Sequence, residues 1–219
     1  MAFDCVIFDL DGTLLNTLDD LCDSVNAALE LCGYPRRKKE EVRGFVGNGV
    51  ARLVALAVPS GTSLEQTAAC LAVFKEIYAE RCRDKTAPYE GIRELLSALK
   101  KKGIKTAIVS NKLDAAVKAL SQTYFSGLVD VAIGEQEDKG IRKKPHPDMV
   151  LAVMAALSAD ATRTVYVGDS EVDILTAQNA GIPCLSVTWG FRTSCELTQA
   201  GASRLISTAE ALWEAIMGE

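Results

Sequence analysis

The sequence is poor in several features that mark specialised classes of protein. Of its 219 residues, only 6 are proline and 16 are glycine, which excludes collagen-like and proline-rich architectures. Basic residues are outnumbered, since 24 lysines and arginines stand against 29 aspartates and glutamates, and the net charge is -5. This balance offers no broad surface for nucleic acid or for an anionic membrane, but it leaves room for a local site that binds a small anion.

Long apolar segments and closely spaced cysteine pairs are also missing. The longest unbroken apolar run, 149–157, is much too short to cross a bilayer. The seven cysteines are odd in number and no two of them form a C-x-x-C pair, so the sequence does not support a zinc site. Most of them lie in apolar runs, and the first residues lack the positive charge of a signal peptide. We therefore expect free thiols and a cytoplasmic location.

The sequence does contain regularly alternating strand and helix patterns. Hydrophobic residues make up 48% and charged residues 24%, as in an ordinary globular protein. Short segments rich in valine and isoleucine predict buried strands at 3–9, 105–110, 129–134, 164–169 and 183–188. Helical patterns are found at 92–99, 114–123, 147–156, 172–180 and 208–217, with Gly103 ending the first and Ser207-x-x-Glu210 predicted as a capping box for the last. Such alternation predicts an α/β fold with a parallel sheet covered on both faces.

One connection in this pattern is far too long for a single crossover. Nearly a hundred residues separate the first two strands, and 15–83 is almost wholly helical in its apolar spacing. Ser63-x-x-Gln66 predicts a capping box for a long helix within it. We therefore expect a helical domain of residues 15–83 inserted into a core of residues 1–14 and 84–219.

Polar residues stand at the carboxyl ends of three of the expected strands. In a parallel sheet these ends share one edge, where ligands of open α/β folds bind. Asp9 and Asp11 end the first strand, and because side chains alternate along a strand we expect both carboxylates on one side. Gly12 allows a tight turn after them. The other polar residues expected at this edge are Thr13, Ser110, Asn111, Asp169 and Asp173, with Lys144 just before the helix 147–156.

These acidic residues favour a cation site that receives phosphate. Two carboxylates about 4 Å apart repel by about 4 kcal/mol at an effective dielectric of about 20. Oxygen ligands without histidine or cysteine suit a hard cation, so we expect Mg²⁺. With Mg²⁺ and Lys144 present, the site accepts a phosphate dianion, whose free oxygens Ser110 and the backbone N–H groups near Asn111 would hold. One carboxylate then attacks phosphorus and another transfers protons.

Four segments resemble the ordered motifs of the haloacid-dehalogenase superfamily: Asp9-x-Asp11-Gly12-Thr13, Ser110-Asn111, Lys144 and Gly168-Asp169-Ser170-x-x-Asp173. The resemblance covers residues 1–14 and roughly 84–219. It implies a Rossmann-like core with a helical cap after the first strand, as in one large subgroup. It implies Asp9 as nucleophile, Asp11 as acid and base, and Lys144 as the residue that steadies nucleophile and phosphate. It also implies Mg²⁺ bound by Asp9, the Asp11 backbone carbonyl and Asp169, with Asp173 behind them or bound through water.

The residue at position 11 and two further segments indicate which subgroup of the superfamily the chain resembles. Dehalogenases of the superfamily carry an aromatic residue where Asp11 stands, and phosphonatases carry a small one, so Asp11 disfavours both. Segment 46–50, which contains Gly47 and Asn48, and the run 110–112 look like phosphoglycolate phosphatases. The resemblance therefore implies a small phosphorylated metabolite, 2-phosphoglycolate first, with Gly47 and Asn48 at the substrate. A substrate carboxylate could pair with a cation nearby in sequence, namely Arg43, Arg52 or Lys112.

Other interpretations stay open at this stage. The same superfamily contains sugar-phosphate mutases, pyrophosphatases and sugar phosphatases, and a phospho-accepting signalling module also gathers acidic residues, a hydroxyl and a lysine at strand ends. Asp9 and Asp11 could be plain turn formers, Asp173 could stabilise a helix start, and Gly47-Asn48-Gly49 could be an ordinary turn between helices. The oligomeric state is not predicted.

Overall fold

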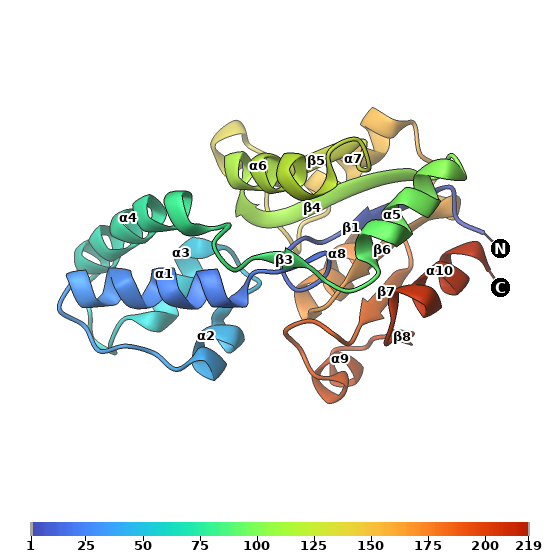
Figure 1. Cartoon of the computed structure of the whole chain (residues 1–219). Coiled ribbons are helices and arrows are strands. Elements are labelled where there is room, and N and C mark those ends of the chain that lie inside the picture. Colours follow the sequence, from blue (N-terminus) through green and yellow to red (C-terminus); the bar gives the residue numbers. More distant parts are fainter. Residues whose placement is uncertain (1, 219) are drawn as a thin grey trace.

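The computed structural model describes residues 2–218 and contains a parallel sheet of six strands. Its strands are β1 (Cys5–Phe8), β4 (Lys105–Leu113), β5 (Val131–Glu135), β6 (Thr164–Gly168), β7 (Cys184–Val187) and β8 (Leu205–Ile206). They lie in the order β5-β4-β1-β6-β7-β8, and every neighbouring pair is parallel. The five predicted strands are confirmed, whereas the two-residue β8 was not predicted. The first strand is therefore central, with β4 and β6 on either side of it (Figure 1).

Helices cover both faces of this sheet. They are α5 (Ile92–Lys101), α6 (Asp114–Phe125), α7 (Asp148–Leu157), α8 (Glu171–Ala180), α9 (Ser194–Gln199) and α10 (Ala209–Met217), with short 3-10 turns η1 (Glu137–Lys139) and η2 (Ala161–Arg163). Val6 and Phe8 of β1 pack with α5, α6 and α10, whereas Cys5 and Ile7 pack with α7 and α8. The alternation of strand side chains thus divides the core into two apolar layers, and the predicted α/β class is confirmed.

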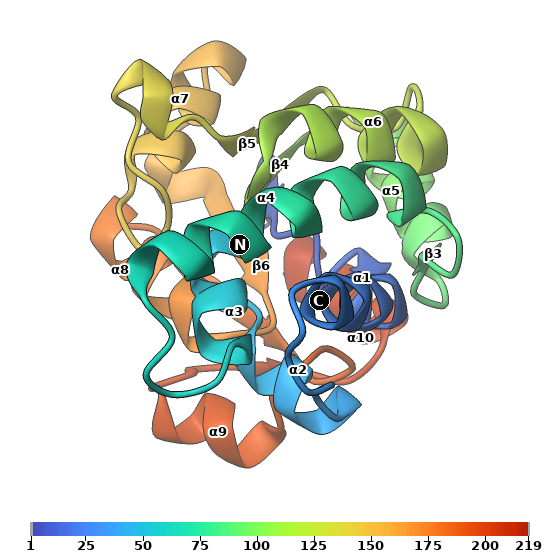
Figure 2. The same cartoon turned by 90° about the vertical axis from the view of Figure 1, so that its left-hand side faces the viewer.

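Four further helices lie to one side of the sheet (Figure 1). These cap helices are α1 (Leu18–Leu31), α2 (Lys39–Phe45), α3 (Val50–Ala57) and α4 (Leu64–Arg81). They share a hydrophobic cluster of their own, in which the rings of Phe74 and Tyr78 stack with centroids 5.3 Å apart. Figure 2, viewed from their side, shows α1, α3 and α4 in front of the sheet. The exact division at residues 14/15 and 83/84 stays a prediction.

The chain passes between the sheet and the cap helices through two short strands. β2 (Leu15–Asn16) and β3 (Ala87–Pro88) form an antiparallel pair in which Leu15 faces Pro88. Outgoing and returning segments are therefore joined by backbone hydrogen bonds at the point where the insertion begins and ends. This pair was not predicted, because each strand has only two residues.

The predicted helix starts are partly confirmed. The Ser63 hydroxyl accepts a hydrogen bond from the Gln66 amide at 3.2 Å, as the capping box requires. The capping box at Ser207 is wrong, because α10 begins one residue later and the Thr208 hydroxyl accepts from the Ala211 amide instead. Within the described residues, none of the helices combines the length and the apolar character that crossing a membrane would require.

Candidate active site

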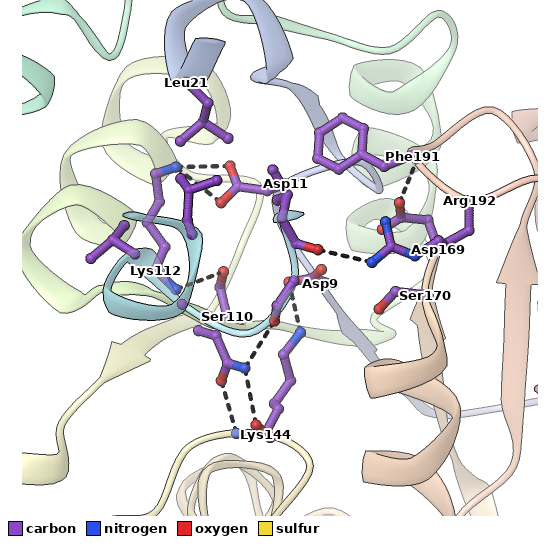
Figure 3. Close-up of a pocket in the computed structure, with 16 residues that line it drawn as sticks. Asp9, Asp11, Leu21, Ser110, Lys112, Lys144, Asp169, Ser170, Phe191 and Arg192 are labelled. Atoms are coloured by element: carbon purple, nitrogen blue, oxygen red, sulfur yellow. Dashed lines mark hydrogen bonds and ion pairs between the residues drawn. The ribbon is translucent and has the colours of Figure 1, made fainter. Parts of the chain in front are cut away.

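A cavity lies between the carboxyl edge of the sheet and the cap helices (Figure 3). Its polar wall comes from the core, and much of its apolar wall comes from the cap helices. The core contributes Asp9, Asp11, Ser110, Asn111, Lys112, Lys144, Asp169, Ser170, Phe191 and Arg192. The cap side contributes Leu21, Val46, Gly47, Gly49, Val50 and Leu53. Residues remote in sequence thus meet in one pocket, as the strand-end argument predicts.

Asp9 stands at the end of the central strand and points into this cavity. Its backbone amide donates to the Val167 carbonyl at 2.9 Å, which fixes the residue against β6. Its side chain is nearly buried, and Oδ1 lies 2.9 Å from Nζ of Lys144 but accepts no hydrogen bond of good geometry. Burial raises the pKa of Asp9 to about 7, with Asp173 adding to the effect and Lys144 opposing it.

Lys144 lies between two carboxylates. Its Nζ is 2.7 Å from Oδ1 of Asp173 and 2.9 Å from Oδ1 of Asp9, and it donates to the Tyr166 hydroxyl at 3.1 Å. Burial disfavours the charge, yet Asp173 and Asp9 outweigh it and raise the pKa of Lys144 well above its usual value. The ammonium therefore stays charged beside Asp9.

Asn111 fixes the backbone of this lysine. Its amide nitrogen donates to the Lys144 carbonyl at 3.0 Å, and its amide oxygen accepts from the Lys144 N–H at 2.8 Å. The same amide nitrogen lies 3.0 Å from the Gly47 carbonyl in the loop between α2 and α3. Asn111, whose neighbouring backbone amides the sequence predicts at the phosphate, thus uses its side chain to join β4, the lysine loop and the cap.

Asp169 and Asp173 complete the acidic group. Thr13 donates its hydroxyl to Oδ1 of Asp169 at 3.1 Å, and the Phe191 amide donates to Oδ2 at 2.7 Å. Asp173 is fully buried, and its Oδ2 accepts from the amide and hydroxyl of Ser170 at 3.1 and 2.6 Å. Burial, followed by the charges of Asp173 and Asp9, raises the pKa of Asp169 well above its usual value.

These carboxylates suit a hard divalent cation. Asp9, Asp169 and Asp173 each offer an oxygen, and the three oxygens lie within 4.8 Å of one another. The buried Oδ1 of Asp9 lacks a hydrogen bond, so a ligand position is open there. Oxygen donors without nitrogen or sulfur fit a cation of the Mg²⁺ kind.

Glycine lets two loops approach this acidic group closely. A Cβ at Gly12, whose φ is +89°, would lie 2.3 Å from Oδ2 of Asp169. A Cβ at Gly190 would lie 2.4 Å from the same oxygen. Any larger residue at either position would displace Asp169, so both glycines hold the loops against it.

A second buried lysine pairs with Asp11. Nζ of Lys112 lies 2.9 Å from both oxygens of Asp11 and donates to the Tyr78 hydroxyl of α4 at 2.5 Å. Burial disfavours the ammonium, but Asp11 and Tyr78 raise the pKa of Lys112 above its usual value. A charged pair therefore connects the predicted proton-transfer residue to the cap helices.

The cap loop is held from the core by Arg192. Its guanidinium donates to the carbonyls of Val46 and Arg43 at 2.9 and 3.2 Å and pairs with Glu171 at 2.9 Å. These carbonyls lie at the carboxyl end of α2, where the helix dipole favours a cation. Arg192 thus links the loop after β7 to the segment that covers the cavity.

The structure brings most of the predicted site residues together. Asp9, Asp11, Gly47, Ser110, Asn111, Lys144 and Asp169 line the cavity. Gly12, Thr13 and Asp173 lie directly behind it, each against Asp169 or Lys144. Asn48 is exposed and does not line the cavity. The roles of these residues stay predictions.

Sequence reasoning missed part of the cavity wall. Phe191 and Arg192 were not singled out, although they follow β7 and so stand at the same carboxyl edge as the other site residues. Gly190-Phe191-Arg192 therefore gave a usable signal, namely a glycine turn and a cation just after a predicted strand. The apolar lining from Leu21, Val50 and Leu53 gave none, because these residues read as ordinary helix core.

Comparison with known proteins agrees with this geometry. The sequence profile of haloacid dehalogenase-like hydrolases matches residues 6–187. A phosphoglycolate phosphatase from Caulobacter vibrioides is 35% identical over 190 residues, which cover 85% of this chain and 79% of the relative. A phosphoglycolate phosphatase from Pseudomonas putida is 33% identical over 213 residues, which cover 94% of this chain and 77% of the relative.

A solved structure gives the same result in three dimensions. The crystal structure of a candidate phosphoglycolate phosphatase from Lactobacillus delbrueckii subsp. bulgaricus superposes with a TM-score of 0.95. It is 38% identical, and the match covers 100% of both chains. These matches confirm the prediction made from the four motifs: the chain belongs to the family of haloacid dehalogenase-like hydrolases and is similar to its phosphoglycolate phosphatases.

Proposed function

We propose that the protein is a Mg²⁺-dependent phosphatase that hydrolyses a small phosphomonoester through an aspartyl-phosphate. The observation that carries this proposal is Asp9, which lines the cavity and whose buried Oδ1 lies 2.9 Å from Nζ of Lys144 without accepting a hydrogen bond of good geometry. A carboxylate oxygen that is oriented but not hydrogen-bonded is suited to attack an electrophile. The relatives named as phosphatases support a phosphoric monoester hydrolase.

The chemistry divides between two carboxylates. Asp11 first takes up a proton from solvent. An oxygen of Asp9 then forms a bond to phosphorus while the ester P–O bond breaks, and Asp11 gives its proton to the leaving oxygen. Asp11 then takes a proton from a water molecule whose oxygen attacks phosphorus, and the bond to Asp9 breaks. The products are the alcohol and free phosphate, and both carboxyl groups return to their initial state once Asp11 releases this proton to solvent.

The remaining residues hold the phosphate and the cation. Lys144 would neutralise charge between nucleophile and phosphate, and the Ser110 hydroxyl and the amides near Asn111 would bind phosphate oxygens. Asp9 and Asp169 would hold Mg²⁺, with Asp173 behind them. A bound Mg²⁺ would screen the phosphate oxygens, so that an anionic nucleophile can approach phosphorus.

The substrate is proposed to be 2-phosphoglycolate. Two relatives carry the name phosphoglycolate phosphatase, and the cavity is enclosed by Leu21, Val50 and Leu53 of the cap helices, which leaves space for a short alcohol. A small metabolite fits such an enclosure, whereas a polymer does not.

The test is phosphate release by the purified protein with Mg²⁺ over a panel of small phosphoesters and sugar phosphates. We expect turnover of 2-phosphoglycolate to exceed that of hexose phosphates. Formation of a sugar isomer without free phosphate would favour a mutase instead, and slow loss of the protein's own phosphate without turnover would favour a signalling module.

A further inference from the structure

Lys144 and Arg192, two of the cations that line the cavity, are fully engaged by the protein itself. Lys144 is held between Asp9 and Asp173, both within 2.9 Å of its Nζ. Arg192 pairs with Glu171 and donates to cap carbonyls, including that of Val46. Moving Lys144 toward a substrate would leave two buried carboxylates without their cation, and moving Arg192 would break its bonds to Glu171 and to the cap carbonyls.

Lys112, a third cation on the wall, has a partner that is itself a proposed reacting group. Its side chain is 2% exposed, and its three protons are used by the two oxygens of Asp11 and the hydroxyl of Tyr78. Asp11 lines the cavity and its side chain is 13% exposed. While both Asp11 oxygens remain bound to Lys112, this carboxyl group is engaged away from any leaving group.

We propose that Lys112 binds a second anionic group of the substrate, and that a substrate carboxylate replaces Asp11 on its ammonium. The exchange leaves Lys112 paired with one carboxylate, so no buried charge is left alone. It also frees Asp11 to turn toward the reacting phosphate. This inference rests on the proposed phosphatase function and assigns the substrate class: short phosphomonoesters with a carboxylate close to the ester oxygen.

The surroundings of Lys112 favour it over the other cations suggested by sequence. Arg43 and Arg52 are exposed, and neither lines the cavity. The neighbouring lining residues Leu21 and Leu53 are apolar, so they shield an ion pair from water without competing for it. The Tyr78 hydroxyl fixes the ammonium from the cap side and keeps it in place while carboxylates exchange.

The test compares 2-phosphoglycolate with ethyl phosphate, which has the same two-carbon length but no carboxylate. We expect the unaltered enzyme to show a kcat/KM about 10- to 100-fold higher for 2-phosphoglycolate, the range of one hydrogen bond to a charged group. In Lys112→Met this advantage should vanish. For ethyl phosphate, kcat of Lys112→Met should rise about two- to tenfold, because Asp11 is no longer held by the lysine.

The matched control is Lys118→Met, which removes an exposed lysine paired with Asp114 on α6 and should leave both rates unchanged. Equal kcat/KM of the unaltered enzyme for the two substrates would overturn the inference, and this result does not depend on the folding of any variant. A proportional loss of both rates in a folded Lys112→Met protein would also overturn it. If the unaltered enzyme released phosphate from no phosphoester, the proposed function itself would fail.

Discussion

Lys144 and Lys112 both bring a buried ammonium to the edge of the sheet, but their partners come from different parts of the molecule. Lys144 is bound by Asp9, Asp173 and Tyr166, all from the core. Lys112 is bound by Asp11 of the core and by Tyr78 of the cap helices. The first arrangement stays within the core, whereas the second spans the core and the cap helices, and both border the cavity.

This difference separates two tasks that the proposed reaction requires. The chemistry at phosphorus needs a fixed nucleophile, and the arrangement within the core supplies it. Recognition of a particular substrate alcohol needs side chains whose contacts change when the substrate binds. A lysine that is bound by both the core and the cap helices can change its contacts in this way. Substitutions, metal removal and a change of pH can each test this difference between the two lysines.

Asp9→Asn should produce the largest loss. The amide is nearly the same size but a far weaker nucleophile, so phosphate release should fall at least about a thousandfold. Lys144 keeps Asp173 as its partner, and the fold should therefore survive, as circular dichroism can check. Asp23→Asn, the same change at an exposed aspartate paired with Lys85, is the control and should keep full activity. Near-normal turnover of Asp9→Asn would rule out the nucleophile.

Removal of divalent cations should strongly reduce phosphate release, because the reaction at Asp9 and Lys144 would then lack its cation. We expect dialysis against EDTA to reduce phosphate release at least about a hundredfold, and added Mg²⁺ to restore it. The reason is that Asp9 and Asp169 would hold the cation, with Asp173 behind them, and the mutual repulsion of these carboxylates returns when the cation is lost. Full activity of the metal-free protein would contradict the assignment.

The two lysines should differ in what they contribute to stability. Lys144→Met leaves two buried carboxylates without their cation and should lower the free energy of unfolding by about 3–5 kcal/mol. Lys112→Met should cost about 1–3 kcal/mol, because Asp11 is partly exposed and can turn toward solvent in the cavity. Urea denaturation measures both values, and equal losses would remove the proposed contrast.

The pH dependence of stability provides a finer test of the Lys144 side. Without metal, the pKa of Asp9 is raised from 3.8 to about 7, chiefly by burial. Between these values the folded protein keeps a proton that the unfolded chain releases, so rising pH favours unfolding. Relative to Asp9→Asn, the free energy of unfolding should fall by at most about 1.4 kcal/mol per pH unit in this window. Thermal unfolding in EDTA measures it, and an opposite slope would contradict the raised pKa.

Asn111 should give an effect no larger than that of Lys112, because it acts through neutral hydrogen bonds. Asn111→Ala removes contacts to the Lys144 backbone and to the Gly47 carbonyl, and we expect a loss of about 1–3 kcal/mol in the free energy of unfolding. Asn179→Ala, which removes an exposed bond to the Pro145 carbonyl, should cost less than about 0.5 kcal/mol. A similar cost for both variants would show that Asn111 is not a structural link.

The sequence predicts the edge of the sheet well because the information there is local. Asp9 and Asp169 directly follow apolar strand segments, and parallel strands necessarily bring such ends together. Gly12 is also readable, since a tight turn after a strand favours glycine. Pattern and strand direction therefore suffice to assemble the acidic group.

The remaining contacts depend on packing that no local pattern encodes. Tyr78 follows the apolar spacing of α4 and indicates cap core, and its ring does stack there on Phe74. Its hydroxyl nevertheless reaches Lys112, which depends on how the cap helices sit over the sheet. Asn111 likewise bonds to Lys144, 33 residues away, so its structural use could not be read from the motif.

The paired strands β2 and β3 have a consequence for how such a protein can be rebuilt. Because Leu15 and Pro88 face each other in the antiparallel pair, the two places where the chain leaves and rejoins the sheet are adjacent. A different helical module, or a short hairpin turn, could replace everything between them without moving any sheet strand. Exchange of this one contiguous segment would keep the chemistry at phosphorus and change which alcohols the enzyme accepts. The β2–β3 pair is therefore a suitable junction for chimeric enzymes.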